Sequence, residues 1–483
     1  MRILLINSPM AADDPVSGEY QEQGVFKDGR DLRRSEYYQR KELCLPPLSL
    51  LYITTPLVEA GHEVLVLDAD ALDLTTGEIV REAEKFKPDV IGSNMYYCNM
   101  KVVYRMTRGL KAALDVPVVL GGPQATAMPE RTLDEFEAVD CLVVGWGEGA
   151  IVPLVEYLGG RGKRNDVPGL VYRHDGGVAH NPQWSLPSNL DEIPFPSREP
   201  LRELYERGYY FNILSRHPRF DTLLTSRACP FRCAFCFMPQ GSTYHKHSAE
   251  RVLEEIRQLV DGGVQCVQMV DDLFNLKRKR SQEIIDLVVK ENIKAEFRIR
   301  SRVDLVDEEL LAGFKKMGVS SISYGMESGV DRVLQQMQKK TTVDQNERAC
   351  RLTKQAGMTA TSSWIGGLPS ETPEELDETF RFIQRIRPTT FTMGALIPLP
   401  NTPYYSDAKR DGTLVGDWSV HSEHDPYIKH EHWSSREQLD SHVYHKLSGL
   451  RRNWRYVLQS ARLALWPPNV RLLKYGFRML RSS

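Results

Sequence analysis

Three cysteines stand close together in the middle of the 483-residue chain, and the other five are scattered. Cys229, Cys233 and Cys236 form a C-x3-C-x2-C motif, a spacing that random placement of eight cysteines would give only about 0.002 times per chain. Three thiolates do not complete a tetrahedral zinc site, and no fourth cysteine or histidine follows at zinc-finger distance. A [4Fe–4S] cluster held by three thiolates has one iron left open. The motif therefore predicts an iron–sulfur cluster whose fourth iron binds a substrate or cofactor.

The cysteines follow residues 222–226, T-L-L-T-S, which we expect to be a buried strand. Beyond them strands and helices alternate as far as residue 405. The expected later strands are residues 264–270, 296–300, 319–325, 359–366 and 391–397. Six strands with five helical segments between them predict a partial (β/α)6 barrel over residues 216–405. Chemistry in parallel α/β barrels lies on the loops that leave the carboxyl ends of the strands, which is where the cysteines fall.

The cysteine spacing, with Phe235 directly before the third cysteine, resembles that of the radical S-adenosylmethionine family. In that family the amino and carboxylate groups of S-adenosylmethionine chelate the open iron, and one electron cleaves the cofactor to methionine and a 5′-deoxyadenosyl radical. The resemblance implies that Cys229, Cys233 and Cys236 hold the cluster and that Phe235 packs near the adenine. It also implies an electron donor such as a flavodoxin or ferredoxin.

The resemblance extends to charged residues after the second and third strands of the expected barrel. Asp271 and Asp272 stand where many relatives carry G-G-E, and the family's loop at this place binds the methionine amino group. The resemblance leaves the methionine carboxylate to Arg300 or Arg302, because a guanidinium binds a carboxylate through two hydrogen bonds.

Two further motifs follow the next strands. Glu327 and Ser328 match the family's E-S pair near the ribose. The segment G-G-L-P-S-E-T at 366–372 resembles the family's G-L-P-G-E-T, with Ser370 where glycine is usual. Each motif alone is weak, and their order after successive expected strands is what carries the resemblance.

The first 160 residues alternate five short apolar strands with helices, which predicts an α/β domain with a doubly wound, flavodoxin-like parallel sheet. The expected strands are residues 2–6, 63–67, 89–93, 117–121 and 140–144. Such sheets bind ligands beyond the carboxyl ends of their strands. Candidate binding residues at these ends are Ser93, Gly121, Gly122, Gly147 and Glu148. Glycines there allow backbone amides to approach a phosphate or a flat ring, so composition alone leaves a nucleotide site, a cofactor site or a spacer open.

Four short strings in this domain resemble the cobalamin-binding domain of the cobalamin-dependent branch of the family. They are P-P-L-S-L-L-Y at 46–52, G-H-E-V at 61–64, G-G-P at 121–123 and G-E-G at 147–149. Residues 161–215 resemble the linker of that branch, with a small hairpin at 167–178. No D-x-H-x-x-G motif occurs, so no histidine ligand for cobalt is encoded. The domain therefore either holds cobalamin without such a ligand or is a vestige that binds nothing.

Composition excludes several other classes of protein. The net charge is −2, from 62 basic and 64 acidic residues, and gives no indication of a nucleic-acid partner. No run of about 18 apolar residues predicts a membrane span, and the amino-terminal apolar stretch is too short for a signal peptide. We expect a cytoplasmic protein.

Residues 406–483 are expected to form a variable, mainly helical region that ends in basic helices. Residues 449–483 carry eight Lys or Arg and no acidic residue, and 451–465 and 470–480 have amphipathic spacing. These helices either pack on the barrel or lie on an anionic membrane surface. The second alternative implies a membrane-peripheral enzyme with a lipid-like substrate.

The first functional hypothesis is cobalamin-dependent methylation of an unactivated carbon in a small-molecule or lipid-like substrate. A second is radical cyclisation, rearrangement or dehydration, with cobalamin either catalytic or lost. A third, from another class, is a cobalamin-responsive binding protein with an inert barrel. The motifs do not identify the substrate.

Overall fold

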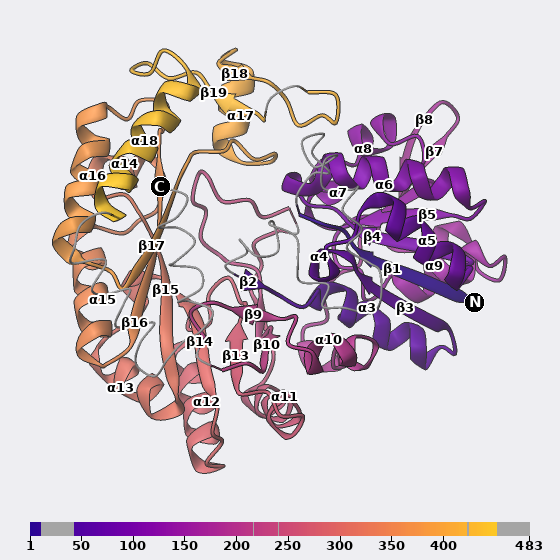
Figure 1. Ribbon diagram of the computed structural model, residues 1–483, viewed down its shortest axis with the longest axis horizontal. Helices are drawn as coiled ribbons and strands as arrows, with labels where there is room; N and C mark the ends of the chain where they lie inside the picture. The colour runs from indigo at the N-terminus through magenta and orange to yellow at the C-terminus, as the bar shows by residue number, and fades with distance from the viewer. Residues whose placement is uncertain (11–42, 216, 240, 423–424, 452–483) are drawn as a thin grey trace, which may run out of the picture. The chain divides into compact units, whose positions relative to one another are not determined.

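The computed structural model describes residues 1–10, 43–215, 217–239, 241–422 and 425–451. The chain divides into two compact units (Figure 1). The first contains Met1–Asn212 and Ser419–His421, and the second contains Ile213–Trp418 and the chain from Ser422 onward. Of the basic tail expected at residues 449–483, residues 452–483 lie outside the described residues.

A seven-stranded sheet forms the middle of the first unit. Its five parallel strands are β1 (Arg2–Asn7), β3 (Glu63–Asp68), β4 (Val90–Asn94), β5 (Val118–Gly121) and β6 (Cys141–Val143). Their order, β3-β1-β4-β5-β6, is that of flavodoxin-like sheets, so the predicted fold class is confirmed. In the segment expected to be a linker, β7 (Leu170–His174) and β8 (Gly177–His180) form a hairpin that pairs antiparallel with β6 and extends the sheet.

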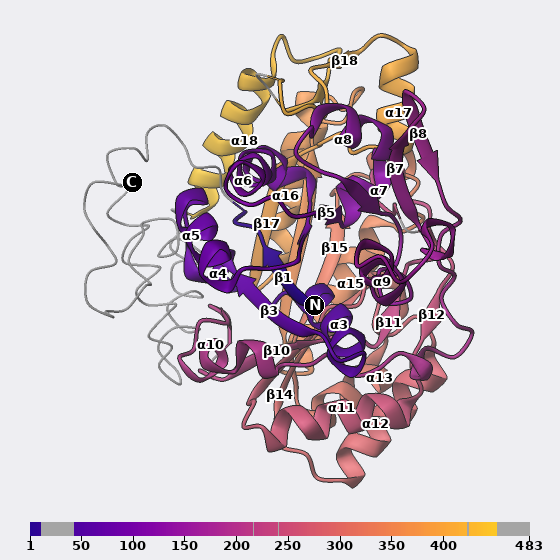
Figure 2. The same cartoon turned by 90° about the vertical axis from the view of Figure 1, so that its right-hand side faces the viewer.

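Helices cover both faces of this sheet, because its strands are apolar on both sides (Figure 2). Leu4 and Ile91 pack with one group of helices, whereas Val90 and Val119 pack with the other. On the first face lie α5 (Thr76–Phe86), α6 (Met100–Ala113), α7 (Pro123–Ala127) and α8 (Pro129–Glu135); on the second lie α3 (Leu48–Glu59) and α9 (Ile151–Leu158). The unit is completed by α4 (Ala69–Leu72), α10 (Arg202–Glu206) and the pair β2 (Leu43–Cys44) with β9 (Phe211–Asn212).

The second unit contains a six-stranded parallel sheet in which the strands follow one another in chain order. They are β10 (Phe220–Leu223), β13 (Cys266–Met269), β14 (Glu296–Ser301), β15 (Val319–Glu327), β16 (Thr359–Gly366) and β17 (Thr390–Ala395). The helices between them are α11 (Ala249–Asp261), α12 (Arg278–Lys290), α13 (Glu308–Met317), α14 (Asp331–Gln336), α15 (Val343–Gln355) and α16 (Pro373–Ile386). This βα repetition is the predicted partial barrel.

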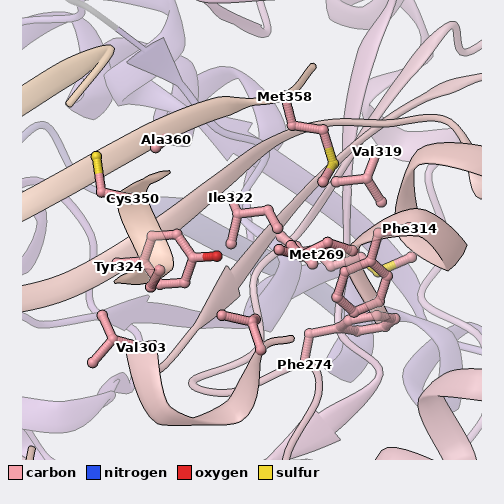
Figure 3. Close-up of a cluster of buried hydrophobic side chains, with 14 of the residues drawn as sticks. Met269, Phe274, Val303, Phe314, Val319, Ile322, Tyr324, Cys350, Met358 and Ala360 are labelled. Atoms are coloured by element: carbon pink, nitrogen blue, oxygen red, sulfur yellow. The ribbon is translucent and has the colours of Figure 1, made fainter. Parts of the chain in front are cut away.

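The main core of the second unit lies between the sheet and these helices (Figure 3). Ile322 and Tyr324 of β15 point into it, together with Met269 of β13 and Phe314 of α13. Side chains alternate along a strand, so the residues between them face the other side of the sheet. That other side is described below.

The carboxyl-terminal part of the second unit adds α17 (Pro403–Arg410), the pair β18 (Leu414–Val415) with β19 (Tyr427–Ile428), and α18 (Arg436–Arg451). Trp433, Leu439 and Val443 anchor this region in the core beside β17. In the described part of the chain, no helix is both long and apolar enough to cross a membrane.

Candidate functional site

A two-stranded ribbon holds the loop that carries the three cysteines. β11 (Ser226–Arg227) pairs antiparallel with β12 (His245–Lys246) and closes the loop at its base, just beyond the carboxyl end of β10. Ala228 leads into the cysteines with φ of +63°, a conformation that L residues rarely adopt. Within the loop Cys233 is buried, whereas Cys229 and Cys236 are half-buried. The chain therefore presents three thiols from one short, folded segment.

Main-chain hydrogen bonds fix the loop internally and to the rest of the unit. Ala234 N–H donates to the Met337 carbonyl over 2.8 Å, and Tyr404 N–H donates to the Ala234 carbonyl over 3.3 Å. Within the loop, Cys236 N–H donates to the Cys233 carbonyl over 3.1 Å. The positions of Cys233 and Cys236 thus depend on segments far away in the sequence.

Asp271 anchors the segment that leads into the loop. Its buried carboxylate accepts hydrogen bonds from the Thr225 N–H at 3.1 Å, the Thr225 hydroxyl at 2.7 Å and the Ser226 hydroxyl at 2.5 Å. Arg280 donates to the Thr225 carbonyl and, through Nε, to the His247 carbonyl, so it ties both ends of the ribbon together. Asp271 is therefore engaged by the protein itself.

Arg302 also holds the cysteine loop, through Phe231. Its guanidinium carbon lies 3.7 Å from the centre of the ring of Phe231, a residue that stands between the first two cysteines in the sequence. The same group pairs with Asp304 over 3.0 Å, and the residue is buried. A stacked and paired guanidinium has little capacity left to bind a methionine carboxylate.

The sequence offered two pairs of candidates for binding methionine, Asp271 with Asp272 and Arg300 with Arg302. Asp272 and Arg300 are the two whose side chains are not engaged by the described part of the protein. Both are exposed, and neither side chain forms a hydrogen bond or ion pair within the described residues. Their charges lie near enough to act on each other. A carboxylate beside a guanidinium matches the ammonium and carboxylate of an amino acid, so Asp272 and Arg300 are our candidates for the methionine part of S-adenosylmethionine.

We therefore predict that Arg300→Gln raises the KM for S-adenosylmethionine about 10-fold to 100-fold, because hydrogen bonds to charged groups contribute about 1.5–3 kcal/mol. The cluster absorbance should be unchanged. Arg302→Gln is the matched comparison, since it should lower cluster content by releasing Phe231. The assignment fails if Arg300→Gln leaves KM unaltered and Arg302→Gln raises it.

Lys339 is a charged residue of this site that the sequence motifs did not indicate. Its Nζ lies 3.0 Å from Glu327 Oε1, and both side chains are buried. The same Nζ lies 5.7 Å from the centre of the Phe235 ring, and its charge acts on the Cys236 thiol. Glu327 has φ of +64°, so the backbone at the end of β15 is strained where this ion pair forms.

The neighbour of Glu327 is enclosed by the fold. Ser328 is fully buried; its Oγ lies 3.2 Å from Thr379 Oγ1 and accepts a hydrogen bond from Val330 N–H. Asn346 donates to its carbonyl. Of the expected E-S pair, Glu327 pairs with Lys339, whose Nζ in turn lies near the Phe235 ring. The Ser328 side chain instead forms hydrogen bonds within the turn after β15.

The thiols fit an iron–sulfur cluster chemically. Burial raises the pKa of Cys236 to about 12, with the charges of Cys233, Cys229 and Asp272 adding to it, and burial raises the pKa of Cys229 as well. Metal binding requires thiolates, so the iron must displace these protons. No three His, Cys, Asp or Glu side chains of the described residues converge on a single metal ion. A cluster suits this arrangement, because each thiolate binds a different iron.

In the first unit, the candidate residues lie at or just after the carboxyl ends of three neighbouring strands, β4, β5 and β6, and hence at one edge of the sheet. Ser93, at the end of β4, is buried; its hydroxyl donates to the Ile6 carbonyl over 2.9 Å and lies 2.8 Å from Ser8 Oγ. Gly121 is the last residue of β5 and Gly122 follows it. Gly147 and Glu148 form the half-buried turn before α9. The structure therefore brings these five residues to the same edge.

Two of the glycines at this edge are required by the protein itself. Gly122 has φ of +96°, and a Cβ there would lie 2.9 Å from both the N and the O of Met95. At Gly149 a Cβ would lie 2.3 Å from the Trp184 ring, so the G-E-G turn is covered by a side chain from the segment expected to be a linker. No sequence pattern indicated this contact.

The polar groups at this edge fit cobalamin held without a histidine ligand. Asn94 Oδ1 and Gln124 Oε1 are buried acceptors with no hydrogen-bond partner among the described residues. Cobalamin carries amide side chains whose N–H groups suit such acceptors. The histidines of residues 1–212 are His62, His174 and His180, and none follows a parallel strand at its carboxyl end.

Asp68 is a buried carboxyl group at the same edge, at the end of β3. It accepts hydrogen bonds from Asn7 Nδ2 at 2.7 Å, the Tyr210 hydroxyl at 2.8 Å and Ala71 N–H at 3.0 Å. Burial nevertheless raises its pKa from 3.8 to about 6, against the effect of these donors. Asp68 therefore holds its proton to a higher pH in the folded state than in the unfolded chain.

This raised pKa predicts a pH dependence of stability. Because the folded pKa exceeds the unfolded one, the contribution of Asp68 is full below pH 4 and is lost as the pH rises to about 6, a change of about 3 kcal/mol. Asp68→Asn should remove that dependence. Urea unfolding of both proteins at pH 4.5 and 7 measures it, and parallel changes in the two proteins would contradict it.

Comparisons with known proteins identify the two domains of the chain. The model of the radical SAM superfamily matches residues 223–383, and the model of the B12 binding domain matches residues 40–155. An uncharacterized methyltransferase of Pyrococcus horikoshii is 31% identical over 399 residues, which cover 81% of this chain and 85% of that protein. An anaerobic magnesium-protoporphyrin IX monomethyl ester cyclase of Rubrivivax gelatinosus is 29% identical over 410 residues, covering 82% and 72%.

Among solved structures, the chain resembles the radical S-adenosylmethionine methyltransferase TsrM from Kitasatospora setae, solved with cobalamin and a [4Fe–4S] cluster bound. The TM-score is 0.66 at 19% identity, and the match covers 86% of this chain and 77% of that one. This likeness concerns the fold.

The cysteine loop beside a parallel sheet and the flavodoxin-like first unit define a radical enzyme with a second cofactor domain. The chain belongs to the cobalamin-dependent branch of the radical S-adenosylmethionine superfamily. Its cofactors are a [4Fe–4S] cluster, S-adenosylmethionine and cobalamin, as the sequence predicted. The roles of the individual side chains stay predictions.

Proposed function

We propose that this enzyme transfers a methyl group to an unactivated carbon of its substrate. The observation that carries the proposal is the 31% identity to a methyltransferase over residues of both units, with 85% of that relative covered. The cofactor set supports it, since cobalamin carries methyl groups and a radical cofactor activates carbons that acid–base chemistry does not.

The bound cofactors would supply hydrogen abstraction and the methyl group, and the chain's own residues would hold and orient them. Cys229, Cys233 and Cys236 would hold the cluster, and Asp272 and Arg300 would bind the methionine ammonium and carboxylate. Asp271, Arg302 and Lys339 would keep the loop and its charges in place.

A second candidate is radical cyclisation or rearrangement without methyl transfer. It is supported by the cyclase of Rubrivivax gelatinosus, whose match covers 82% of this chain at 29% identity. Both candidates use the same cluster and the same binding of S-adenosylmethionine, so the site residues alone do not separate them.

The enzyme needs a one-electron reductant, and we infer that a flavodoxin or a ferredoxin supplies the electron. Both are small proteins that deliver single electrons at low potential, as reduction of a [4Fe–4S] cluster requires.

The decisive experiment is anaerobic incubation of the reconstituted enzyme with S-adenosylmethionine labelled in its methyl group and extracts of the producing cells. We expect a labelled product together with 5′-deoxyadenosine. Substrate-dependent 5′-deoxyadenosine with an unlabelled product would overturn methylation and favour the second candidate.

A further inference from the structure

The face of the second unit's sheet that lies opposite the core is polar. On β15 and β16 the residues Ile322, Tyr324 and Trp364 point toward the helices and are buried. From Ser321 onward the alternate positions of β15 to β17 carry serine, threonine and glycine, apart from Glu327 at the end of β15 and Ile365 of β16. We call this surface the hydroxyl face, defined by Ser323, Thr361, Ser363, Thr392 and Gly394.

The register of the strands makes the hydroxyl face continuous with the site. Arg300 of β14 lies opposite Ser323 of β15, which lies opposite Thr361 of β16. One row further on, Ser363 of β16 lies opposite Thr392 of β17. Three strand spacings separate Arg300 from β17, about 14 Å. The face is therefore wider than the amino-acid part of S-adenosylmethionine that we assign to Arg300 and Asp272.

The hydroxyl groups of this face retain hydrogen-bonding capacity. Thr392 Oγ1 donates to Ser363 Oγ over 3.4 Å, and Thr361 Oγ1 accepts from Thr390 Oγ1 over 3.1 Å, which leaves each hydroxyl further donor or acceptor capacity. The Ser323 hydroxyl forms no hydrogen bond within the described part of the chain. Ser323 and Ser363 are half-buried, whereas Thr392 and Gly394 are exposed. A Cβ at Gly394 would meet nothing within 4 Å, so this end of the face has room beside Thr392.

The chemistry of the face selects between ligand classes. A hydrocarbon placed over this face would leave the Ser323 hydroxyl buried without a partner, at a cost of about 1–3 kcal/mol, and would deprive the other hydroxyls of the water that satisfies their remaining capacity. A ligand with its own hydroxyl, carbonyl or amide groups would replace the water they lose with direct hydrogen bonds. The arrangement therefore favours a polar occupant.

We propose that the substrate is a polar, water-soluble small molecule rich in hydroxyl, carbonyl or amide groups, and that it lies on the hydroxyl face. This inference rests on the proposed function in one respect: it takes the substrate to lie beside the bound S-adenosylmethionine. It assigns the substrate to the polar small molecules among the classes expected from the sequence and sets the lipid-like class aside.

The test uses the reconstituted full-length enzyme with methyl-labelled S-adenosylmethionine and a cell extract divided into a water–methanol phase and a chloroform phase. The proposal expects the water–methanol phase to stimulate 5′-deoxyadenosine formation. Stimulation by the chloroform phase instead would overturn it. Label in the product is read separately, so stimulation by the water–methanol phase without label overturns methylation and leaves the substrate class standing.

A pair of matched variants tests the face itself. Thr392→Val removes one hydroxyl at nearly constant shape and should lower product formation about threefold to tenfold at limiting extract, as loss of one hydrogen bond predicts. Thr413→Val, outside the sheet, makes the same change without this effect. Cluster absorbance checks that both variants are folded. Equal product formation by the two variants would overturn the assignment of the face.

Discussion

Replacing Cys229, Cys233 or Cys236 by alanine is expected to remove the visible absorbance of the reconstituted cluster and to abolish 5′-deoxyadenosine formation. The three thiols are the ligands that the loop offers, and a cluster held by only two of them has lost a third of its protein bonds. Absorbance, iron and sulfide content, and product analysis after anaerobic reconstitution measure the effect.

The remaining cysteines provide the controls. Cys98 is exposed, and Cys44 and Cys350 are buried in places remote from the loop in the sequence. Alanine at these positions should leave cluster content and product formation largely intact, although the two buried sites are expected to lose some stability. Full cluster content in Cys233→Ala would refute the assignment.

Asp271→Ala is the second variant for which we expect a large effect. It leaves three buried donors, the Thr225 N–H and the hydroxyls of Thr225 and Ser226, without their acceptor. Each unsatisfied group costs about 1–3 kcal/mol, so the ribbon below the cysteines should lose several kcal/mol of stability. We expect poor retention of the cluster, measured as iron content after gel filtration.

Asp272→Ala is the matched control, since it removes the same group from the adjacent, exposed position. It should keep the cluster and raise the KM for S-adenosylmethionine. If both variants retained the cluster equally well, Asp271 would not have the anchoring role that its hydrogen bonds indicate.

The local signals in the sequence predicted most of the fold. Serine is a common residue at the start of helices, and Ser248 caps α11 by accepting a hydrogen bond from Arg251 N–H. β16 covers the expected residues 359–366. These elements follow from hydrophobic periodicity and helix capping, which are properties of neighbouring residues.

Which residues of the site hold the loop and which are free to bind a cofactor depends on contacts that short motifs do not encode. Asp271 and Asp272 are adjacent in sequence, yet one is buried under Thr225 and the other is exposed. Successive residues of an extended chain point in opposite directions, and the sequence does not say which direction faces the loop. Lys339 carries no motif, and it reaches Glu327 only because the turn after α14 folds back toward β15.

The cysteine loop has a consequence for how the enzyme matures. Its base is closed by the β11–β12 pairing, its entrance is held by Asp271, and its first half is covered by Arg302 stacked on Phe231. All of these contacts join protein groups. We therefore expect the loop to take its shape before the cluster is inserted. Iron and sulfide should enter under native conditions, with far-ultraviolet circular dichroism nearly unchanged.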